Sequence, residues 1–292
     1  MSLRIDYNGH AIRYSNNYLY HIPTELPHFT MRLKFTNGIT PTFSKGSAVQ
    51  LSASPNVWDL TYQDADWTDL LKYQTDLLEI LDANTTGVTN MVGLVLGCEN
   101  LTTVPLFDTS GVTNMMGMFG NCSAITSVPL FDTSNVTNMQ SMFAGCRVLT
   151  AVPLFDTSKV LSFTSMLEQC RGITTVPSFN TSSALSMGSM FHECTSLTTV
   201  PLFDTSLVVN MNQMFRDCWS LKAIPLLDTS SSTDMRLMCA GCTEVESGAL
   251  ALYQQASSQA VPPSSYTRCF YDCGRDTTTG AAELALIPSD WK

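Results

Sequence analysis

A cysteine returns every 24 residues through half of this chain of 292 residues. The series comprises Cys98, Cys122, Cys146, Cys170, Cys194, Cys218 and Cys242. Prolines keep the same step at Pro105, Pro129, Pro153, Pro177, Pro201 and Pro225. A fixed period of about 20–50 residues is typical of a solenoid, in which each unit forms one turn of a coil. One turn alone buries too little apolar surface to offset the entropy of ordering its backbone, so we expect the turns to stack.

The first part of each unit predicts a short strand followed by a corner. Leu101-x-x-Val104-x-Leu106 fits the strand of a leucine-rich repeat. Val104 and Leu106 alternate, so we expect both side chains on the same, buried face. Asp108 and Ser110 follow, and these short polar side chains favour turns because they bond to nearby backbone N–H groups.

The second part of each unit predicts a capped short helix. One position carries only residues that are preferred at a helix N-cap. These residues are Asp66, Asn90, Asn114, Asn138, Ser162, Ser186, Asn210 and Asp234. Met115, Met118, Phe119 and Cys122 then follow at i, i+3, i+4 and i+7, which is one stripe of a helix. The expected fold is therefore an α/β solenoid, a leucine-rich-repeat-like right-handed coil of 24-residue turns.

The repeated phrase also resembles a known family. The run from Phe131 to Cys146, Phe-Asp-Thr-Ser-Asn-Val-Thr-Asn-Met-x-x-Met-Phe-x-x-Cys, resembles the leucine-rich repeats of BspA-type bacterial surface proteins. The resemblance covers roughly residues 66–247, with a tighter corner here because Leu106 and Phe107 are adjacent. It implies a secreted or surface protein that binds host proteins and matrix.

We expect three regions along the chain. Residues 1–65 lack the period and form a small β-rich module, residues 66–247 form the array, and residues 248–292 form a degenerate C-terminal capping repeat. The module's expected strands are Arg4–Asn8, Tyr18–Ile22, Thr30–Phe35, Val49–Leu51 and Val57–Tyr62. Its three histidines, His10, His21 and His28, lack metal-site spacing.

Both ends of the array are expected to be closed by caps. The register extends back to Asp66, which predicts a longer cap helix over Asp66–Leu81 leading into a degenerate first turn. Beyond the array, Leu250–Gln255 predicts a short helix, and Cys269–Cys273 repeats the end of the unit. Trp291 is placed to cover the last exposed edge of the core.

Composition excludes several classes of function. The net charge is −10, from 15 basic and 25 acidic residues, and no basic stripe is present. Binding to nucleic acid or to anionic membranes therefore is not expected. No apolar run reaches the ~18 residues of a membrane span, and the first ten residues lack the apolar segment of a signal peptide.

Three further columns of the repeat have both a structural and a functional interpretation. The cysteines are interpreted as buried, reduced thiols, and Cys239-x-x-Cys242 alone is a weak metal signal. The acidic column comprises Asn84, Asp108, Asp132, Asp156, Asn180, Asp204 and Asp228. Asx turns at each corner are the favoured interpretation, with calcium between turns as the alternative. The column that begins at Phe107 is either a core corner or an exposed aromatic track, and we favour the core.

Variation between turns concentrates on one edge, which is the candidate binding site. Its residues are Arg147, Glu168, Arg171, His192, Arg216 and Trp219. The 24-residue step places Glu168, His192 and Arg216 in one column and Arg147, Arg171 and Trp219 in another. A solvated face with chance ion pairs is the alternative, but Trp and Arg are typical anchors of protein interfaces.

No enzyme signature, catalytic residue, cofactor site or metal site is expected from these patterns. We expect a non-enzymatic recognition or structural protein that contacts protein or a repetitive glycan. It would act as a surface adhesin at the cell surface, or as a tail or receptor-binding part of a phage virion. The alternative is an intracellular interaction scaffold, which a ladder of free thiols would allow.

Overall fold

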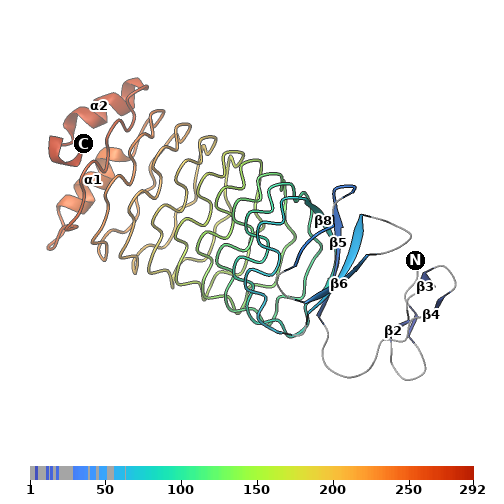
Figure 1. Cartoon of the computed structure of the whole chain (residues 1–292). Helices are drawn as coiled ribbons and strands as arrows, with labels where there is room; N and C mark the ends of the chain where they lie inside the picture. Colours follow the sequence, from blue (N-terminus) through green and yellow to red (C-terminus); the bar gives the residue numbers. More distant parts are fainter. Residues whose placement is uncertain are drawn as a thin grey trace.

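The main part of the chain is a coil of stacked turns, seen in a computed structural model (Figure 1). The structure describes residues 4–5, 11–12, 14–15, 18–19, 29–38, 40–43, 46–50, 56–62 and 64–292. Parallel bridges join equivalent residues of successive turns, beginning with Asp66 to Asn90 and Asn90 to Asn114. The 24-residue period of the sequence is therefore one layer of the coil, and the predicted register from Asp66 onward is confirmed.

Backbone hydrogen bonds alternate between neighbouring layers and the same layer. The N–H groups of Ser141 and Phe143 donate to the next layer, at 2.9 Å to Thr164 O and 2.9 Å to Met166 O. The intervening N–H of Met142 donates within its own layer, to Met139 O at 3.1 Å. Because every second N–H points along the coil, each layer is bonded to the next without forming a long strand.

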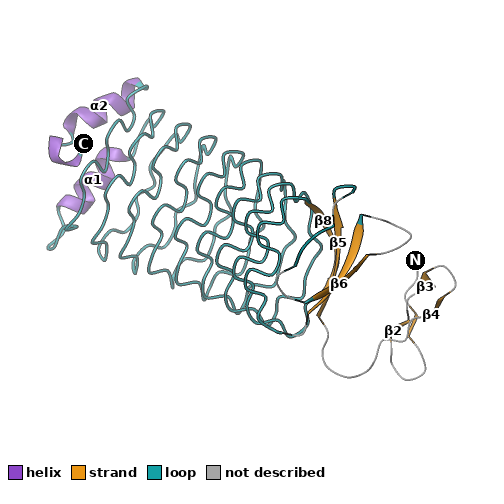
Figure 2. Ribbon diagram, viewed as in Figure 1, coloured by secondary structure: helices purple, strands orange, loops and turns teal. Residues whose placement is uncertain are grey.

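The predicted short helix is wrong. In the region of the predicted helix each layer holds a series of four-residue turns, and the described array from residue 66 to 247 contains no α-helix (Figure 2). Ser141 and Gly145 have positive φ angles of 54° and 77°, which an α-helix cannot accommodate. Two tandem turns bury residues i, i+3, i+4 and i+7, the same set that a helical stripe would bury. The predicted strand is also reduced: in this part of the described layers, bridges occur at Thr103 and Ala223, and the layers between them have none.

A sheet closes the N-terminal end of the coil. Its four strands, in the order β6-β7-β5-β8, are β5 (Phe29–Phe35), β6 (Ser47–Gln50), β7 (Val57–Tyr62) and β8 (Leu77–Asn84). All the pairings are antiparallel. The outer edge of β8 also meets the coil, because Ile80 N–H donates to Thr103 O at 3.2 Å.

The predicted strands over Thr30–Phe35 and Val57–Tyr62 are confirmed by β5 and β7. Two small antiparallel pairs also occur, between β1 (Arg4–Ile5) and β2 (Ala11–Ile12) and between β3 (Tyr14–Ser15) and β4 (Tyr18–Leu19). The rest of the expected strands Arg4–Asn8 and Tyr18–Ile22, as well as Leu51, His10, His21 and His28, lies outside the described residues.

The expected cap helix over Asp66–Leu81 is wrong. Residues 67–76 form turns that are bonded to the next layer, starting with Trp67 N–H to Asn90 O at 2.9 Å. The chain then enters β8, which pairs with β5, a strand that precedes residue 65 in the sequence. The apolar pattern of this segment is satisfied by a layer followed by a strand, so a cap helix is not needed.

Helices occur only beyond the array among the described residues. They are α1 (Ala249–Ser257), α2 (Thr278–Leu286) and the 3-10 turn η1 (Ser289–Trp291). α1 confirms the expected short helix, and the bond from Cys239 N–H to Cys269 O at 2.8 Å confirms that Cys269–Cys273 continues the stack. Trp291 is buried and stacks on Tyr266 with ring centroids 4.3 Å apart. The coil thus ends under an aromatic cover.

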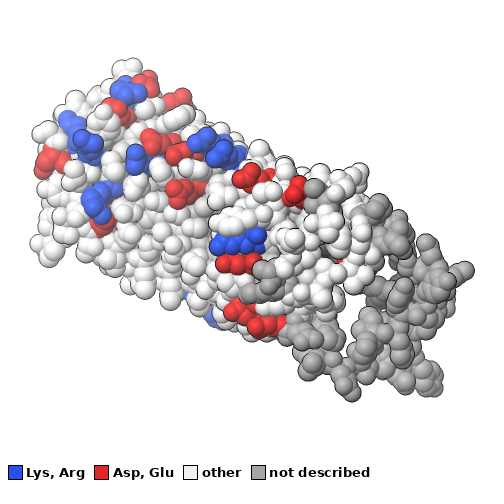
Figure 3. All heavy atoms as spheres, in the orientation of Figure 1, with Lys and Arg blue, Asp and Glu red and all other residues white. Residues whose placement is uncertain are grey.

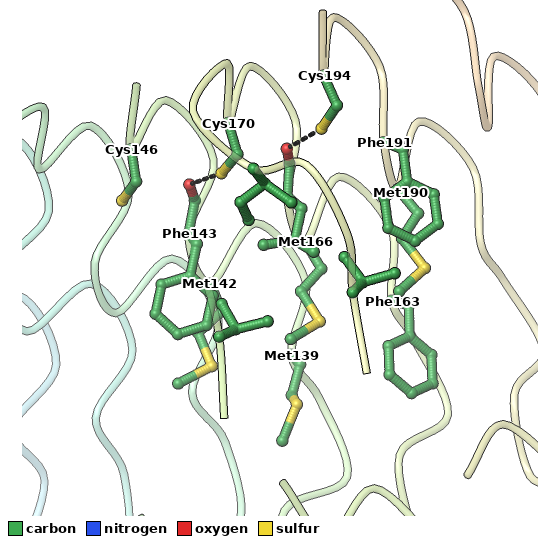
Figure 4. Close-up of a cluster of buried hydrophobic side chains, with 14 of the residues drawn as sticks. Met139, Met142, Phe143, Cys146, Phe163, Met166, Cys170, Met190, Phe191 and Cys194 are labelled. Carbon is green, nitrogen blue, oxygen red and sulfur yellow. Dashed lines mark hydrogen bonds between the residues drawn. The ribbon is translucent and has the colours of Figure 1, made fainter. Parts of the chain in front are cut away.

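The core runs the length of the coil as columns of like side chains. Met142, Phe143 and Cys146 of one layer are fully buried with their counterparts in the next (Figure 4). Phe119 and Phe143 stack with centroids 5.5 Å apart and planes within 4°. Such pairs add about 0.5–1.5 kcal/mol beyond their burial, which favours like residues in adjacent layers.

Candidate functional site

The acidic corners are Asx turns. In the layer of Asp132, one carboxylate oxygen accepts from Ser134 N–H at 3.0 Å and from the Ser134 hydroxyl at 2.7 Å. These bonds hold the pKa of Asp132 below its ordinary value. Asn180 makes the equivalent bonds to Ser182 at 3.1 and 2.8 Å. The corner therefore needs an oxygen acceptor but no charge, as the Asx interpretation predicts.

The predicted N-cap residues have a related role. Asn138 Oδ1 accepts from Gln140 N–H at 2.9 Å, and Asn114 accepts in the same way from Met116 N–H at 3.1 Å. These N–H groups are the ones at the start of the tandem turns. The predicted cap residues therefore do accept hydrogen bonds from backbone N–H groups, but the element that they cap is a turn and not a helix.

The cysteine column is buried and contains free thiols. Cys170 Sγ donates to Phe143 O at 3.1 Å, and every ladder cysteine makes the same contact with the preceding layer (Figure 4). All ten cysteines of the chain are free and buried. Burial raises the pKa of Cys146 and of Cys194 to about 12, so both are protonated thiols at neutral pH. They act as small hydrophobic residues with a weak donor.

The phenylalanine column lies in the core, as favoured, whereas the expected orientation of Leu106 is wrong. Phe107 is 3% exposed, but Leu106 is 66% exposed while Val104 is 9% exposed. In later layers a three-residue turn explains this, since Phe131 N–H donates to Pro129 O at 3.0 Å. The residue between them, the leucine, stands at the outside of the corner.

The variable edge brings several of its predicted residues together. His192 Nδ1 lies 3.1 Å from Glu168 Oε1, and Arg171 pairs with Glu193 at 2.5 Å. Arg216 pairs with Asp217 at 3.2 Å. Figure 3 shows charged side chains gathered along one side of the coil, over the turns toward the C-terminal end. The contacts of His192 with Glu168 and of Arg171 with Glu193 link successive layers, whereas Arg216 and Asp217 are neighbours within one layer.

Two carboxylates at this edge were not among the predicted site residues. Glu193 and Asp217 lie 3.9 and 3.8 Å from His192 Nε2, so with Glu168 they surround the ring. Hydrogen bonding to His192 lowers the pKa of Glu168, and hydrogen bonding to Arg171 lowers that of Glu193. Their position beside the 24-residue column of His192 is the sequence signal that could have found them.

Arg147 and Trp219 are exposed and belong to the same edge. Neither makes an ion pair or a ring contact with another described residue. They remain candidates for contact with a partner, and so does Arg171, whose side chain is 47% exposed despite its pair with Glu193.

No metal cluster is formed within the described part of the chain, where no three His, Cys, Asp or Glu side chains are grouped so as to hold an ion. No helix among the same residues is both long and apolar enough to cross a bilayer.

Together these features define a repeat protein built of stacked 24-residue turns with a variable charged edge. The chain belongs to the family described as "Mycoplasma protein of unknown function, DUF285", whose model matches residues 68–175 and 150–251.

The structure is also similar to the crystal structure of a leucine-rich repeat protein from Eubacterium ventriosum ATCC 27560. The two share 16% sequence identity over 64% of this chain, with a TM-score of 0.39. The chain spans 57% of that protein's length. No curated protein sequence matches the chain.

Proposed function

We propose that this protein is a non-enzymatic recognition protein with a leucine-rich-repeat-like, right-handed solenoid fold. It would contact a protein or a repetitive glycan, either as a BspA-type surface adhesin or as a tail or receptor-binding part of a phage virion. The alternative is an intracellular interaction scaffold. The proposal includes neither binding to nucleic acid nor insertion into a membrane, because the net charge of −10 repels anionic surfaces.

The observation that carries this proposal is the contrast between a repeated surface and a variable one. The exposed column that begins at Thr103 presents similar small residues in every layer. It can therefore recognise only a ligand whose own structure repeats. The edge that holds Arg171, His192 and Trp219 differs from layer to layer. A unique protein partner needs unique contacts, and exposed Trp and Arg are the usual anchors.

Binding to a panel of immobilised matrix proteins and glycans tests the proposal. We expect the double variant R171A/W219A to lose protein binding by about tenfold or more, since an anchor contributes ~2 kcal/mol or more. Its melting temperature should change little, because exposed ion pairs contribute ~0–1 kcal/mol.

The variant T103E/T175E, on the repeated surface, is the matched control. It should keep protein binding and lose only a repetitive glycan. If T103E/T175E lost protein binding while R171A/W219A kept it, the variable edge would be the wrong surface.

A further inference from the structure

One corner of the coil carries an apolar column that the core leaves exposed. Its leucines are Leu106, Leu130, Leu154, Leu202 and Leu226, with exposed fractions of 66, 62, 61, 71 and 54%. Adjacent layers lie ~4.8 Å apart, so the column extends over ~24 Å. The layer of Ser178 divides it into Leu106, Leu130 and Leu154 on one side and Leu202 and Leu226 on the other. The exposed leucines therefore form two apolar stretches in line on one corner rather than a set of scattered side chains.

A column of carboxylates runs beside these leucines. In each layer the aspartate follows the leucine by two residues, so their Cα atoms are at most ~7 Å apart. Its members are Asp108, Asp132, Asp156, Asp204 and Asp228, all of them exposed. Hydrogen bonds from serine lower the pKa of Asp108, Asp132, Asp156 and Asp204, which keeps them ionised at neutral pH. We call these ten residues the Leu–Asp ridge.

Leucine and aspartate occur together or not at all. The layer that has Ser178 in place of leucine also has Asn180 in place of aspartate, and the layer at β8 has Asp82 with Asn84. The other five layers have both residues. Folding does not impose this pairing, because Asn180 makes the same corner bonds as Asp156, which contacts Ser158 at 3.0 and 2.7 Å. The charge is thus kept only where the leucine is kept.

We propose that the Leu–Asp ridge docks a cationic amphipathic protein segment, one whose apolar side chains cover the leucines while its Lys or Arg side chains face the aspartates. Charge complementarity selects this occupant. A second copy of the chain would place its own acidic column and its net charge of −10 against this one. An anionic membrane or a nucleic acid would be repelled in the same way.

Lys159 is the cation that the structure places near this column, where it lowers the pKa of Asp156 and donates to Asn135 at 2.8 Å. One lysine against five carboxylates leaves the column strongly negative. An extended segment of about seven residues would cover ~24 Å.

The test measures binding of a peptide of about eight residues that alternates leucine and lysine, by fluorescence anisotropy at low and high salt. Two matched peptides replace every leucine with serine or every lysine with glutamate. We expect the leucine–lysine peptide to bind at least about tenfold more tightly than either control, and salt to weaken it.

Two variants of the full chain follow substitutions that the protein already carries. The first replaces the five aspartates of the ridge with Asn, as at Asn180, and the second replaces its five leucines with Ser, as at Ser178. Each should lose binding by about tenfold or more. The Asn variant keeps the corner bonds and hence the fold, so it remains informative if the Ser variant unfolds. R171A/W219A should bind the peptide normally, which separates this proposal from the proposed function.

The proposal would be overturned if the Asn variant bound the leucine–lysine peptide as tightly as the wild type does. It would also be overturned if the wild type bound the serine–lysine peptide as tightly as the leucine–lysine peptide. Dimerisation of the wild type that the Ser variant abolishes, or binding to zwitterionic vesicles that exceeds binding to the peptide, would show a different occupant.

Discussion

The hydroxyl of Thr133 donates a hydrogen bond of 2.8 Å to the carbonyl oxygen of Asp156, in the next layer of the coil. Equivalent threonines repeat this contact at Thr85, Thr109, Thr157, Thr181 and Thr205. All are buried. At the end of the series Thr229 meets the Gln259 side chain at 2.5 Å instead, so the C-terminal cap replaces the missing layer.

Thr133→Val should destabilise the protein by about 1–2 kcal/mol, because it keeps the shape of the buried side chain but removes the donor to the Asp156 carbonyl. Thr137→Val is the control, since Thr137 makes a similar bond to Thr113 O, at 3.2 Å, on the exposed surface. Chemical denaturation compares the two. Equal midpoints for the two variants would mean that the buried ladder adds no stability.

Ser141 distinguishes tandem turns from a helix, because its φ of 54° lies in the left-handed region. Ser141→Gly should raise the melting temperature relative to Ser141→Ala, as left-handed backbone costs a residue with a Cβ about 1–2 kcal/mol. Gly117 holds the equivalent position with open space around it. In a helix the order would reverse, since Gly is about 1 kcal/mol worse than Ala. Thermal melts of both variants decide between the two structures.

The buried thiols make stability fall at alkaline pH. The folded pKa of Cys146 is raised from 9.0 to about 12 by burial, so the folded state holds this proton more tightly than the unfolded state. Its stabilisation is complete below pH 9.0 and is lost as the pH rises toward 12. Each such thiol contributes a slope of about 1.4 kcal/mol per pH unit in that window.

Melting temperatures between pH 7 and 10.5 check this slope, and Cys146→Ala should reduce it. Thiol labelling gives an independent readout. The ladder cysteines should react with a thiol reagent only after denaturation, and rapid labelling of the native protein would contradict their burial.

The contribution of Glu168 to stability should be lost in acid rather than in base. Its pKa is lowered, first by the bond to His192, so its contribution is present above 4.5 and disappears as the pH falls through the lower folded value. Glu168→Gln should lose at most about 1 kcal/mol at pH 7, because the pair is partly exposed to solvent. The difference from wild type should shrink as the pH falls below 4.5. Melting curves at pH 7 and at successively lower pH test this, with the exposed Glu99→Gln as control.

The sequence predicts how the turns stack better than it predicts the local structure within each turn. The period alone placed Cys146 and Phe143 in the core, because identical spacing forces like residues into columns. It could not separate a helix from tandem turns, since both bury Met139, Met142, Phe143 and Cys146. The positive φ angles of Ser141 and Gly145 and the bonds to the next layer separate them, and serine gives no sign of a positive φ.

The predictions for Leu106 and for the first layer are wrong for different reasons. Alternation predicts a buried Leu106 only if a strand continues through it, and no strand forms there. The apolar spacing of the first layer predicts a helix over Asp66–Leu81, because the pairing of β8 with β5, more than 40 residues earlier in the chain, leaves no sign in the local sequence. At the candidate site the 24-residue step correctly brought Glu168 beside His192, but it could not show which arginines are already paired.

The alternation of backbone bonds between and within layers has a consequence for how such a chain can change length. Equivalent residues of each layer make equivalent bonds to the layers on either side, so every layer is interchangeable with its neighbours at the backbone. Loss of 24 residues, for example 139–162, would rejoin Asn138 to Phe163 and bring two matching bonding surfaces together. A gene for this protein can therefore gain or lose whole units by unequal recombination. The coil would lengthen or shorten in steps of ~4.8 Å, while both end covers stay in place.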